Sequence, residues 1–164
     1  MIKKLNYKIV DNFINQKDFE ILKNTMLSNK FEWYCGGDGV SGTKDDGIYF
    51  THNFYDNYKP RSNHIHLLDP IVKKLNAKSF IRIKGNLYPK TNKIYEHGSH
   101  KDYDFKHKSF IFYINTNNGF TKLENGVKVK SIENRGLFFD SHKDHNSSTC
   151  SDKNRRVNIN FNYF

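Results

Sequence analysis

The sequence is poor in cysteine and in long apolar runs, and each shortage excludes a class of protein. Its two cysteines, Cys35 and Cys150, are too few for the disulfide framework of a small secreted domain. No apolar run approaches the roughly 20 residues that a membrane-spanning helix needs, and no secretory signal pattern begins the chain. We therefore expect a cytoplasmic protein that makes no contact with a membrane.

Blocks of like charge are also missing, although the chain is basic. It carries 27 Lys and Arg against 17 Asp and Glu, a net charge of +10. A positive field attracts phosphates and carboxylates, so nucleic acid is a possible partner. However, the basic residues are mainly lysines spread over the whole length, and no run of five like charges marks a binding tail. The charge alone therefore does not identify the partner.

The 164 residues are enough for one domain with a core and too few for two domains of ordinary size. Residues 1–77 are interpreted as supporting structure. They contain a strand at 7–13, a helix that Asn15 caps and that carries Phe19, Leu22 and Met26 on one face, and a helical pattern at 65–75. Residues 34–47 hold five of the ten glycines, which predicts a loop that could close over a site.

Residues 78–164 show short alternating strands separated by Asn, Gly and Lys turns. This pattern is typical of an antiparallel barrel or a jelly roll. We expect a mainly β fold with supporting helices. The predicted strands cover residues 79–88, 94–97, 108–115, 119–122, 127–131, 135–139 and 155–163.

His100 and Asp102 form the first part of a candidate metal centre. In an extended segment, residues two apart point to the same side, so this imidazole and this carboxylate can reach one ion. A third ligand must come from a distant strand, and His145 follows the strand at 135–139. Two histidines and one carboxylate on one octahedral face leave three open positions, which suits redox chemistry with oxygen. His142 competes with His145, and a His97/His100 pair is a further alternative.

Arg156 opens the last predicted strand, in which apolar residues alternate with asparagines. It shares the face of Asn158 and Asn160, whereas Arg155 shares the face of Val157. If the asparagine face lines a lumen, the Arg156 guanidinium can bind the far carboxylate of a small diacid as a bidentate pair. Arg155 is the alternative.

Several linked motifs carry a resemblance to a known family. They are Asn86-Leu87-Tyr88-Pro89 ahead of His100, the segment from Phe112 to Thr121, and the strand from Gly136 to Asp140. Residues 81–163 resemble the Fe(II)- and 2-oxoglutarate-dependent dioxygenase superfamily, in its prolyl-4-hydroxylase-like branch and near the stand-alone oxygenases of marine phages. Two departures are Phe120, where the family has a second glycine, and an arginine clamp where prolyl hydroxylases often have lysine.

The resemblance implies a double-stranded β-helix, or jelly roll, that binds Fe(II), 2-oxoglutarate and O2, with ascorbate as reductant. It implies that His100, Asp102 and His145 bind the metal and that Arg156 binds the co-substrate carboxylate. Tyr88, Tyr113 and Asn86 would donate hydrogen bonds to the co-substrate. The products would be succinate, CO2 and a substrate hydroxylated at a C–H bond.

A prolyl-like peptidyl side chain is the substrate that the resemblance favours, in the host cytoplasm if the gene belongs to a phage. A nucleic-acid base is an alternative, motivated by the net charge and by the Asn86-Leu87-Tyr88 motif, which also resembles that of alkylation-repair dioxygenases. Those enzymes carry a second arginine after the clamp on the final strand, whereas only asparagines and apolar residues follow Arg156 here. A metal-free jelly-roll binding module is a third possibility.

Overall fold

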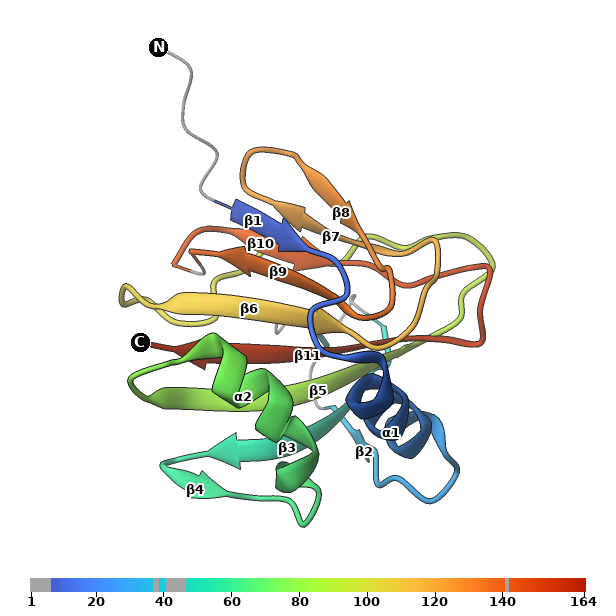
Figure 1. The fold of residues 1–164 in the computed structure, drawn as a ribbon. Helices are drawn as coiled ribbons and strands as arrows, with labels where there is room; N and C mark the ends of the chain where they lie inside the picture. The colour runs from blue at the N-terminus through green and yellow to red at the C-terminus, as the bar shows by residue number, and fades with distance from the viewer. Residues whose placement is uncertain (1–6, 37–38, 41–46, 141) are drawn as a thin grey trace.

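Two antiparallel sheets and two α-helices make up the computed structural model, which describes residues 7–36, 39–40, 47–140 and 142–164. Figure 1 shows both helices in front of the larger sheet. The helices are α1 (Gln16–Leu27) and α2 (Asp69–Leu75), the latter preceded by a 3-10 turn, η1 (Ile65–Leu68). The strands are β1 (Tyr7–Val10), β2 (Tyr34–Cys35), β3 (Phe50–Asp56), β4 (Lys59–Pro60), β5 (Phe80–Pro89), β6 (Lys108–Tyr113), β7 (Phe120–Leu123), β8 (Lys128–Lys130), β9 (Arg135–Phe139), β10 (His145–Ser147) and β11 (Arg155–Tyr163).

The larger sheet has eight strands in the order β1-β9-β6-β11-β5-β3-β2, with β4 paired to β3, and the smaller sheet has the order β10-β7-β8. The last strand, β11, lies between β5 and β6 and pairs with both. Its Asn158 is opposite Asn86 on β5 and Tyr113 on β6. A chain that closes two facing antiparallel sheets in this crossed order is a jelly roll, so the expected fold class is confirmed.

The two faces of β11 have different surroundings, as its alternating pattern predicts. Val157, Ile159 and Phe161 are fully buried in the main core, which also contains Phe19 and Leu22 of α1. The asparagines on the other face point toward the smaller sheet, where a second apolar cluster joins β6 and β9 to β7 and β8. The polar inner face and the helix-covered outer face therefore follow from period-2 alternation.

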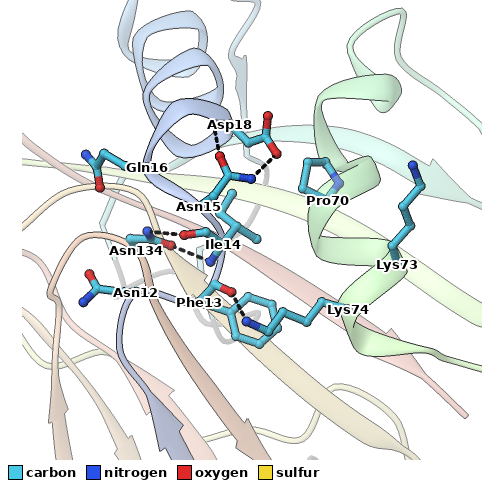
Figure 2. A pocket seen from close by; sticks show the side chains of 10 residues that line it. All are labelled: Asn12, Phe13, Ile14, Asn15, Gln16, Asp18, Pro70, Lys73, Lys74 and Asn134. Carbon is cyan, nitrogen blue, oxygen red and sulfur yellow. Dashed lines mark hydrogen bonds between the residues drawn. The ribbon is translucent and has the colours of Figure 1, made fainter.

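The N-terminus of α1 is capped as expected. The Asn15 side chain accepts a hydrogen bond from the backbone N–H of Asp18 at 3.0 Å. Beside it lies an open hollow of about 830 Å³ between α1 and α2 (Figure 2). Two of its polar side chains bind the backbone next to it: Lys74 donates to the Phe13 carbonyl, and the Asn134 side chain accepts from the Ile14 N–H and donates to the Ile14 carbonyl. This hollow therefore supports the packing of the helices.

Some predicted elements differ from the structure. The predicted strand at 94–97 is wrong, because that segment makes only one isolated bridge, from Glu96 to Ser148 just after β10. His145 was expected in the connection that follows the strand at 135–139, but it begins a strand of its own, β10. The strand β3 was not predicted. Of the glycine-rich stretch, residues 37–38 and 41–46 lie outside the described residues.

Within the described chain, no helix is long and apolar enough to cross a membrane.

Gly136 on β9 provides a test of the core. A Cβ atom there would lie 2.4 Å from a ring carbon of Phe110, which is fully buried. The ring is confined by Phe13, Phe138 and Phe161 at centroid distances of 4.6 to 5.6 Å, so it cannot move away cheaply. We expect Gly136→Ala to lower the free energy of unfolding by about 1 to 3 kcal/mol in urea denaturation.

The matched control is Lys8→Ala on the neighbouring strand β1, where the side chain is exposed. It should change the free energy of unfolding by about 0.5 kcal/mol or less. Equal stability of Gly136→Ala and the unmodified protein would contradict the packing described here.

Candidate metal centre

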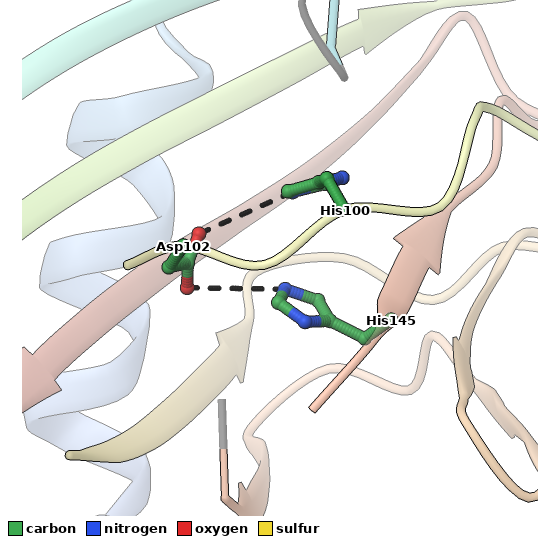
Figure 3. Close-up of side chains that lie close together, drawn as sticks. All are labelled: His100, Asp102 and His145. Atoms are coloured by element: carbon green, nitrogen blue, oxygen red, sulfur yellow. Dashed lines mark ion pairs between the residues drawn. The ribbon is translucent and has the colours of Figure 1, made fainter. Parts of the chain in front are cut away.

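Three side chains with metal-binding atoms meet in the space between the two sheets. His100 and Asp102 lie between β5 and β6, and His145 begins β10. Backbone hydrogen bonds of 3.0 Å in both directions pair His100 with His145. His100 Nε2 lies 4.0 Å from Asp102 Oδ1, and His145 Nε2 lies 3.8 Å from Asp102 Oδ2 (Figure 3). Among the described residues, this is the one such group of His, Cys, Asp or Glu side chains.

Asp102 is a buried carboxylate with several partners. Its Oδ2 accepts hydrogen bonds from the side-chain amides of Asn160 at 3.0 Å and Asn162 at 2.8 Å, and Arg82 lies 3.4 Å from Oδ1. Burial would raise the pKa of Asp102, but His145, Arg82 and the two amide donors outweigh burial and hold the pKa below its usual range. The carboxylate is therefore ionised at neutral pH, as a metal ligand must be.

The two histidines present their Nε2 atoms to the carboxylate. His145 Nδ1 lies 3.2 Å from the carbonyl oxygen of Lys143, and His100 Nδ1 lies 3.4 Å from that of Gly98. A proton on Nδ1 that points at a carbonyl leaves the lone pair of Nε2 available. Burial lowers the pKa of His145, and this outweighs the opposing effect of Asp102. His145 is therefore neutral, which metal binding requires.

The geometry fits one divalent metal ion. Two imidazoles and a carboxylate on one side of a cavity are the ligand set of non-heme iron sites with open positions. Bonds of about 2.1 Å place neighbouring ligand atoms about 3 Å apart in an octahedral site. The separations are 3.8 and 4.0 Å between each histidine Nε2 and Asp102, and up to 4.8 Å within the group, so the side chains would have to close by about 1 to 2 Å around an ion.

Glu96 ties the segment that carries His100 to the smaller sheet. It accepts hydrogen bonds from Lys122 Nζ at 2.5 Å and from Asn146 Nδ2 at 3.1 Å, and it pairs with Lys128 at 3.1 Å. These donors lower the pKa of Glu96 to about 2. Because Asn146 follows His145 directly, the anchor holds the two histidine-bearing segments together.

A pH-dependent contribution to stability follows from Glu96. Its pKa is lower in the folded protein than in the unfolded chain, so its stabilising effect is present above about pH 4.5 and is lost as the pH falls toward 2. Because the side chain is 31% exposed, screening limits the effect to about 1 kcal/mol. Glu96→Gln should therefore be less stable than the unmodified protein at pH 7. The difference should disappear at low pH in urea denaturation, and a constant difference would contradict this account.

Arg156 is fully buried, and among the described residues it has no carboxylate partner. Its guanidinium donates to the hydroxyl groups of Ser131 at 2.7 Å, Ser147 at 2.6 Å and Thr121 at 3.1 Å, and to the Ser148 carbonyl at 3.3 Å. All four partners are neutral. Burying a charge without a counter-ion is costly. An anion bound next to Arg156 would remove that cost.

Gly119 makes room for the Arg156 side chain. A Cβ atom at Gly119 would lie 2.6 Å from Arg156 Cδ and 2.7 Å from the Thr149 carbonyl oxygen. The Gly119-Phe120-Thr121 motif therefore serves Arg156 twice, because Thr121 also accepts one of its hydrogen bonds. Phe120, the departure from the family pattern, begins β7 and packs under Lys128, whose Nζ lies 4.2 Å from the ring centre.

The two tyrosines lie beside the Arg156 guanidinium. Its carbon is 5.2 Å from the ring centre of Tyr88 and 5.8 Å from that of Tyr113. Burial raises the pKa of both phenols, so both remain hydrogen-bond donors at neutral pH. The Tyr113 hydroxyl donates to Thr121 at 2.9 Å, and Asn86 donates to Asn158 at 3.1 Å. Tyr88 and Asn86 line the cavity that contains the three candidate ligands.

The structure separates the alternatives that the sequence left open. Arg155 donates to the Leu27 carbonyl on the helix side, away from the cavity. His142 and His97 are outside the ligand group. His97 instead packs on the Tyr88 ring, with centroids 5.1 Å apart. The structure therefore places His100, Asp102, His145, Tyr88 and Asn86 around one cavity. Arg156 and Tyr113 lie behind its lining, in contact with Tyr88 and Thr121, and the roles of all seven residues stay predictions.

Sequence reasoning missed the residues that surround these groups. Asn160 and Asn162 were identified as a polar face, but their hydrogen bonds to Asp102 were not foreseen. Tyr49 and Lys84, which also line the cavity, were not considered. The alternation of Arg82, Lys84, Asn86 and Tyr88 along β5 was the available signal, since residues two apart share a face.

Comparison with known proteins identifies the fold. No protein-family model matches the sequence, and no curated protein does. Solved structures do match. A Pseudomonas putida prolyl-4-hydroxylase has 13% identity and a TM-score of 0.66, with 96% of this chain and 92% of that chain covered. The viral collagen prolyl hydroxylase of Paramecium Bursaria Chlorella virus-1, solved with 2-oxoglutarate, has 14% identity and a TM-score of 0.64, with coverage of 96% and 94%.

A third match shows the range of chemistry on this fold. The non-heme alpha-ketoglutarate-dependent epimerase of nogalamycin biosynthesis has 12% identity and a TM-score of 0.66, with 97% of this chain and 77% of that chain covered. The chain therefore has the jelly-roll fold of 2-oxoglutarate and Fe(II) oxygenases, including prolyl-4-hydroxylases. Because one fold hosts several reactions, the reaction is argued from the site.

Proposed function

We propose that the protein is an Fe(II)- and 2-oxoglutarate-dependent oxygenase that hydroxylates a C–H bond. The observation that carries the proposal is the buried, uncompensated Arg156, whose neighbours Tyr88, Ser147 and Thr121 line the same cavity as the three candidate metal ligands. A metal-free binding module has no need for a buried guanidinium next to three convergent metal-binding side chains. A dianionic co-substrate that spans from the metal to Arg156 requires both.

Each residue has a definite role in this proposal. His100, Asp102 and His145 would hold Fe(II), which supplies the redox chemistry by which O2 converts 2-oxoglutarate to succinate and CO2 while a substrate C–H bond is hydroxylated. Arg156 would bind the far carboxylate of 2-oxoglutarate, a charge-assisted contact worth roughly 1.5 to 3 kcal/mol. Tyr88, Tyr113 and Asn86 would orient the co-substrate by hydrogen bonds.

For the substrate we propose a peptidyl, prolyl-like side chain. The supporting observation is the likeness to a bacterial prolyl-4-hydroxylase and a viral collagen prolyl hydroxylase over almost the whole chain. The alternative of a nucleic-acid base is motivated by the net charge of +10. It predicts DNA binding that weakens steeply with salt, whereas a peptide hydroxylase should show none at 150 mM salt.

An anaerobic titration tests the proposal directly. Fe(II) should bind at one ion per chain, and 2-oxoglutarate should then add a visible absorption band. On admission of O2, with ascorbate as reductant, the protein should release succinate. A protein that binds no metal and consumes no 2-oxoglutarate would instead be a binding module, and the proposal would be lost.

A further inference from the structure

A second cationic side chain lines the cavity, and the proposed function leaves it unused. Lys84 of β5 lies in the same lining as the three candidate metal ligands. Its Nζ is 5.8 Å from the centre of the Tyr49 ring. Among the described residues, no carboxylate lies within ion-pair distance of it. Burial lowers the pKa of Lys84 to about 8; Arg82 acts in the same direction, and the more distant Asp102 carboxylate opposes them. Lys84 is therefore still mostly charged at neutral pH.

The metal ion, its ligands and 2-oxoglutarate would provide no counter-ion for Lys84. A divalent ion, Asp102, Arg82 and Arg156 together carry three net positive charges, and dianionic 2-oxoglutarate neutralises two of them. Arg82 already contacts Asp102 and the Asn162 side chain, both at 3.4 Å. The charge of Lys84 is then left without a counter-ion in a largely buried place, where an unpaired charge is costly. A single anionic group on the substrate would compensate it.

Asn160 supplies a second unused polar group beside Lys84. The two residues are directly opposite each other on β11 and β5. Asn160 is 7% exposed and lines the cavity, and its Oδ1 atom has no hydrogen-bond partner. Its Nδ2 donates to Asp102, which fixes the orientation of the amide. Neighbouring strands therefore present one ammonium donor and one buried amide acceptor to the same space.

We propose that Lys84 binds a carboxylate of the substrate and that Asn160 accepts a hydrogen bond from an adjacent amide N–H. The substrate class is then an N-acylated amino acid, or a peptide that carries a carboxylate near the oxidised residue. A phosphate fits less well, because it needs several donors and offers no N–H to Asn160. The inference rests on the proposed oxygenase function and narrows its substrate.

Paired probes in which a neutral amide replaces a carboxylate test this inference. N-acetyl amino acids are compared with their methylamides, and Ac-Pro-Asp-NH2 with Ac-Pro-Asn-NH2. The first comparison places the carboxylate on the residue itself, and the second places it on a flanking side chain. Binding to the protein with Fe(II) and 2-oxoglutarate is measured by anaerobic calorimetry, and stimulation of succinate release is measured in O2. We expect at least one acid to bind about 10-fold or more tightly than its neutral partner.

Variants of Lys84 assign the preference to this side chain. Lys84→Met, which removes the charge and keeps the length, should abolish the preference for acids. It should leave Fe(II) and 2-oxoglutarate binding within about twofold. Lys84→Arg should retain the preference, and the exposed Lys108→Met should behave like the unmodified protein.

The outcomes separate this inference from the oxygenase proposal. If no acid binds better than its neutral partner, or if Lys84→Met keeps the preference, the inference is overturned while the oxygenase proposal stands. If Fe(II) and 2-oxoglutarate fail to bind to the unmodified protein, both are lost.

Discussion

Replacing Asp102 with alanine should weaken Fe(II) binding by at least about 100-fold and reduce succinate release below detection. Asp102 is the one carboxylate of the ligand group, and both histidines face it at 3.8 to 4.0 Å. Two neutral imidazoles alone bind a divalent ion far more weakly than the same pair with a carboxylate. The measurement is metal content after anaerobic loading and desalting, followed by calorimetric titration with Fe(II).

The control for this change is Asp104→Ala, two residues further along the same segment. Asp104 is exposed and lies outside the ligand group, so iron binding and turnover should remain unchanged. Because Asn160, Asn162 and Arg82 lose a partner in Asp102→Ala, circular dichroism should confirm that the variant is folded. A folded Asp102→Ala protein that retains stoichiometric iron would disprove the proposed ligand set.

Much of the jelly roll could be predicted from alternation alone. The strand at 155–163 was predicted with the bounds of β11, because Val157, Ile159 and Phe161 alternate with asparagines on a strand that has one apolar and one polar face. The helix α1 was predicted from Asn15 and from Phe19, Leu22 and Met26, which are all buried. Local sequence determines these elements because one face of each is apolar.

The errors occur where long-range contacts decide the structure. β10 is only three residues long and is entirely polar, so no alternation of apolar residues marks it. Its pairing with β7 and its bridge to His100 create the strand. The segment at 94–97 makes one isolated bridge, from Glu96 to Ser148, and the His97 N–H donates to the Ser147 carbonyl, so it is not a strand. Pairing partners far away in the chain cannot be read from a window of a few residues.

The candidate site shows the same division between local and distant information. His100 and Asp102 could be predicted as a pair because they are two residues apart on an extended segment. The contacts of Asp102 with Asn160 and Asn162 could not, because they depend on how β11 lies against the segment after β5. Lys84 has no local feature that distinguishes it from the other lysines. Its importance follows from its register opposite Asn160.

Replacing Arg156 with methionine should weaken 2-oxoglutarate binding by roughly 10- to 100-fold. The guanidinium is fully buried, and its partners among the described residues are all neutral. The bound co-substrate would therefore supply the counter-ion that these residues do not. A charge-assisted contact of roughly 1.5 to 3 kcal/mol corresponds to a change of this size. Fe(II) binding should change little, because Arg156 is not in the ligand group.

A comparison of two 2-oxo acids shows whether the far carboxylate is what Arg156 binds. 2-Oxobutyrate shares the metal-binding end of 2-oxoglutarate but lacks the second carboxylate, so its weak binding should be nearly the same with and without Arg156. Arg155→Met is the matched control, because Arg155 points to the Leu27 carbonyl on the helix side. Both dissociation constants are measured from the anaerobic absorption change of the Fe(II)-loaded protein. An equal loss for both acids in Arg156→Met would mean that Arg156 only supports the packing of Ser131, Ser147 and Thr121. A loss confined to 2-oxoglutarate requires a direct contact between the guanidinium and the second carboxylate.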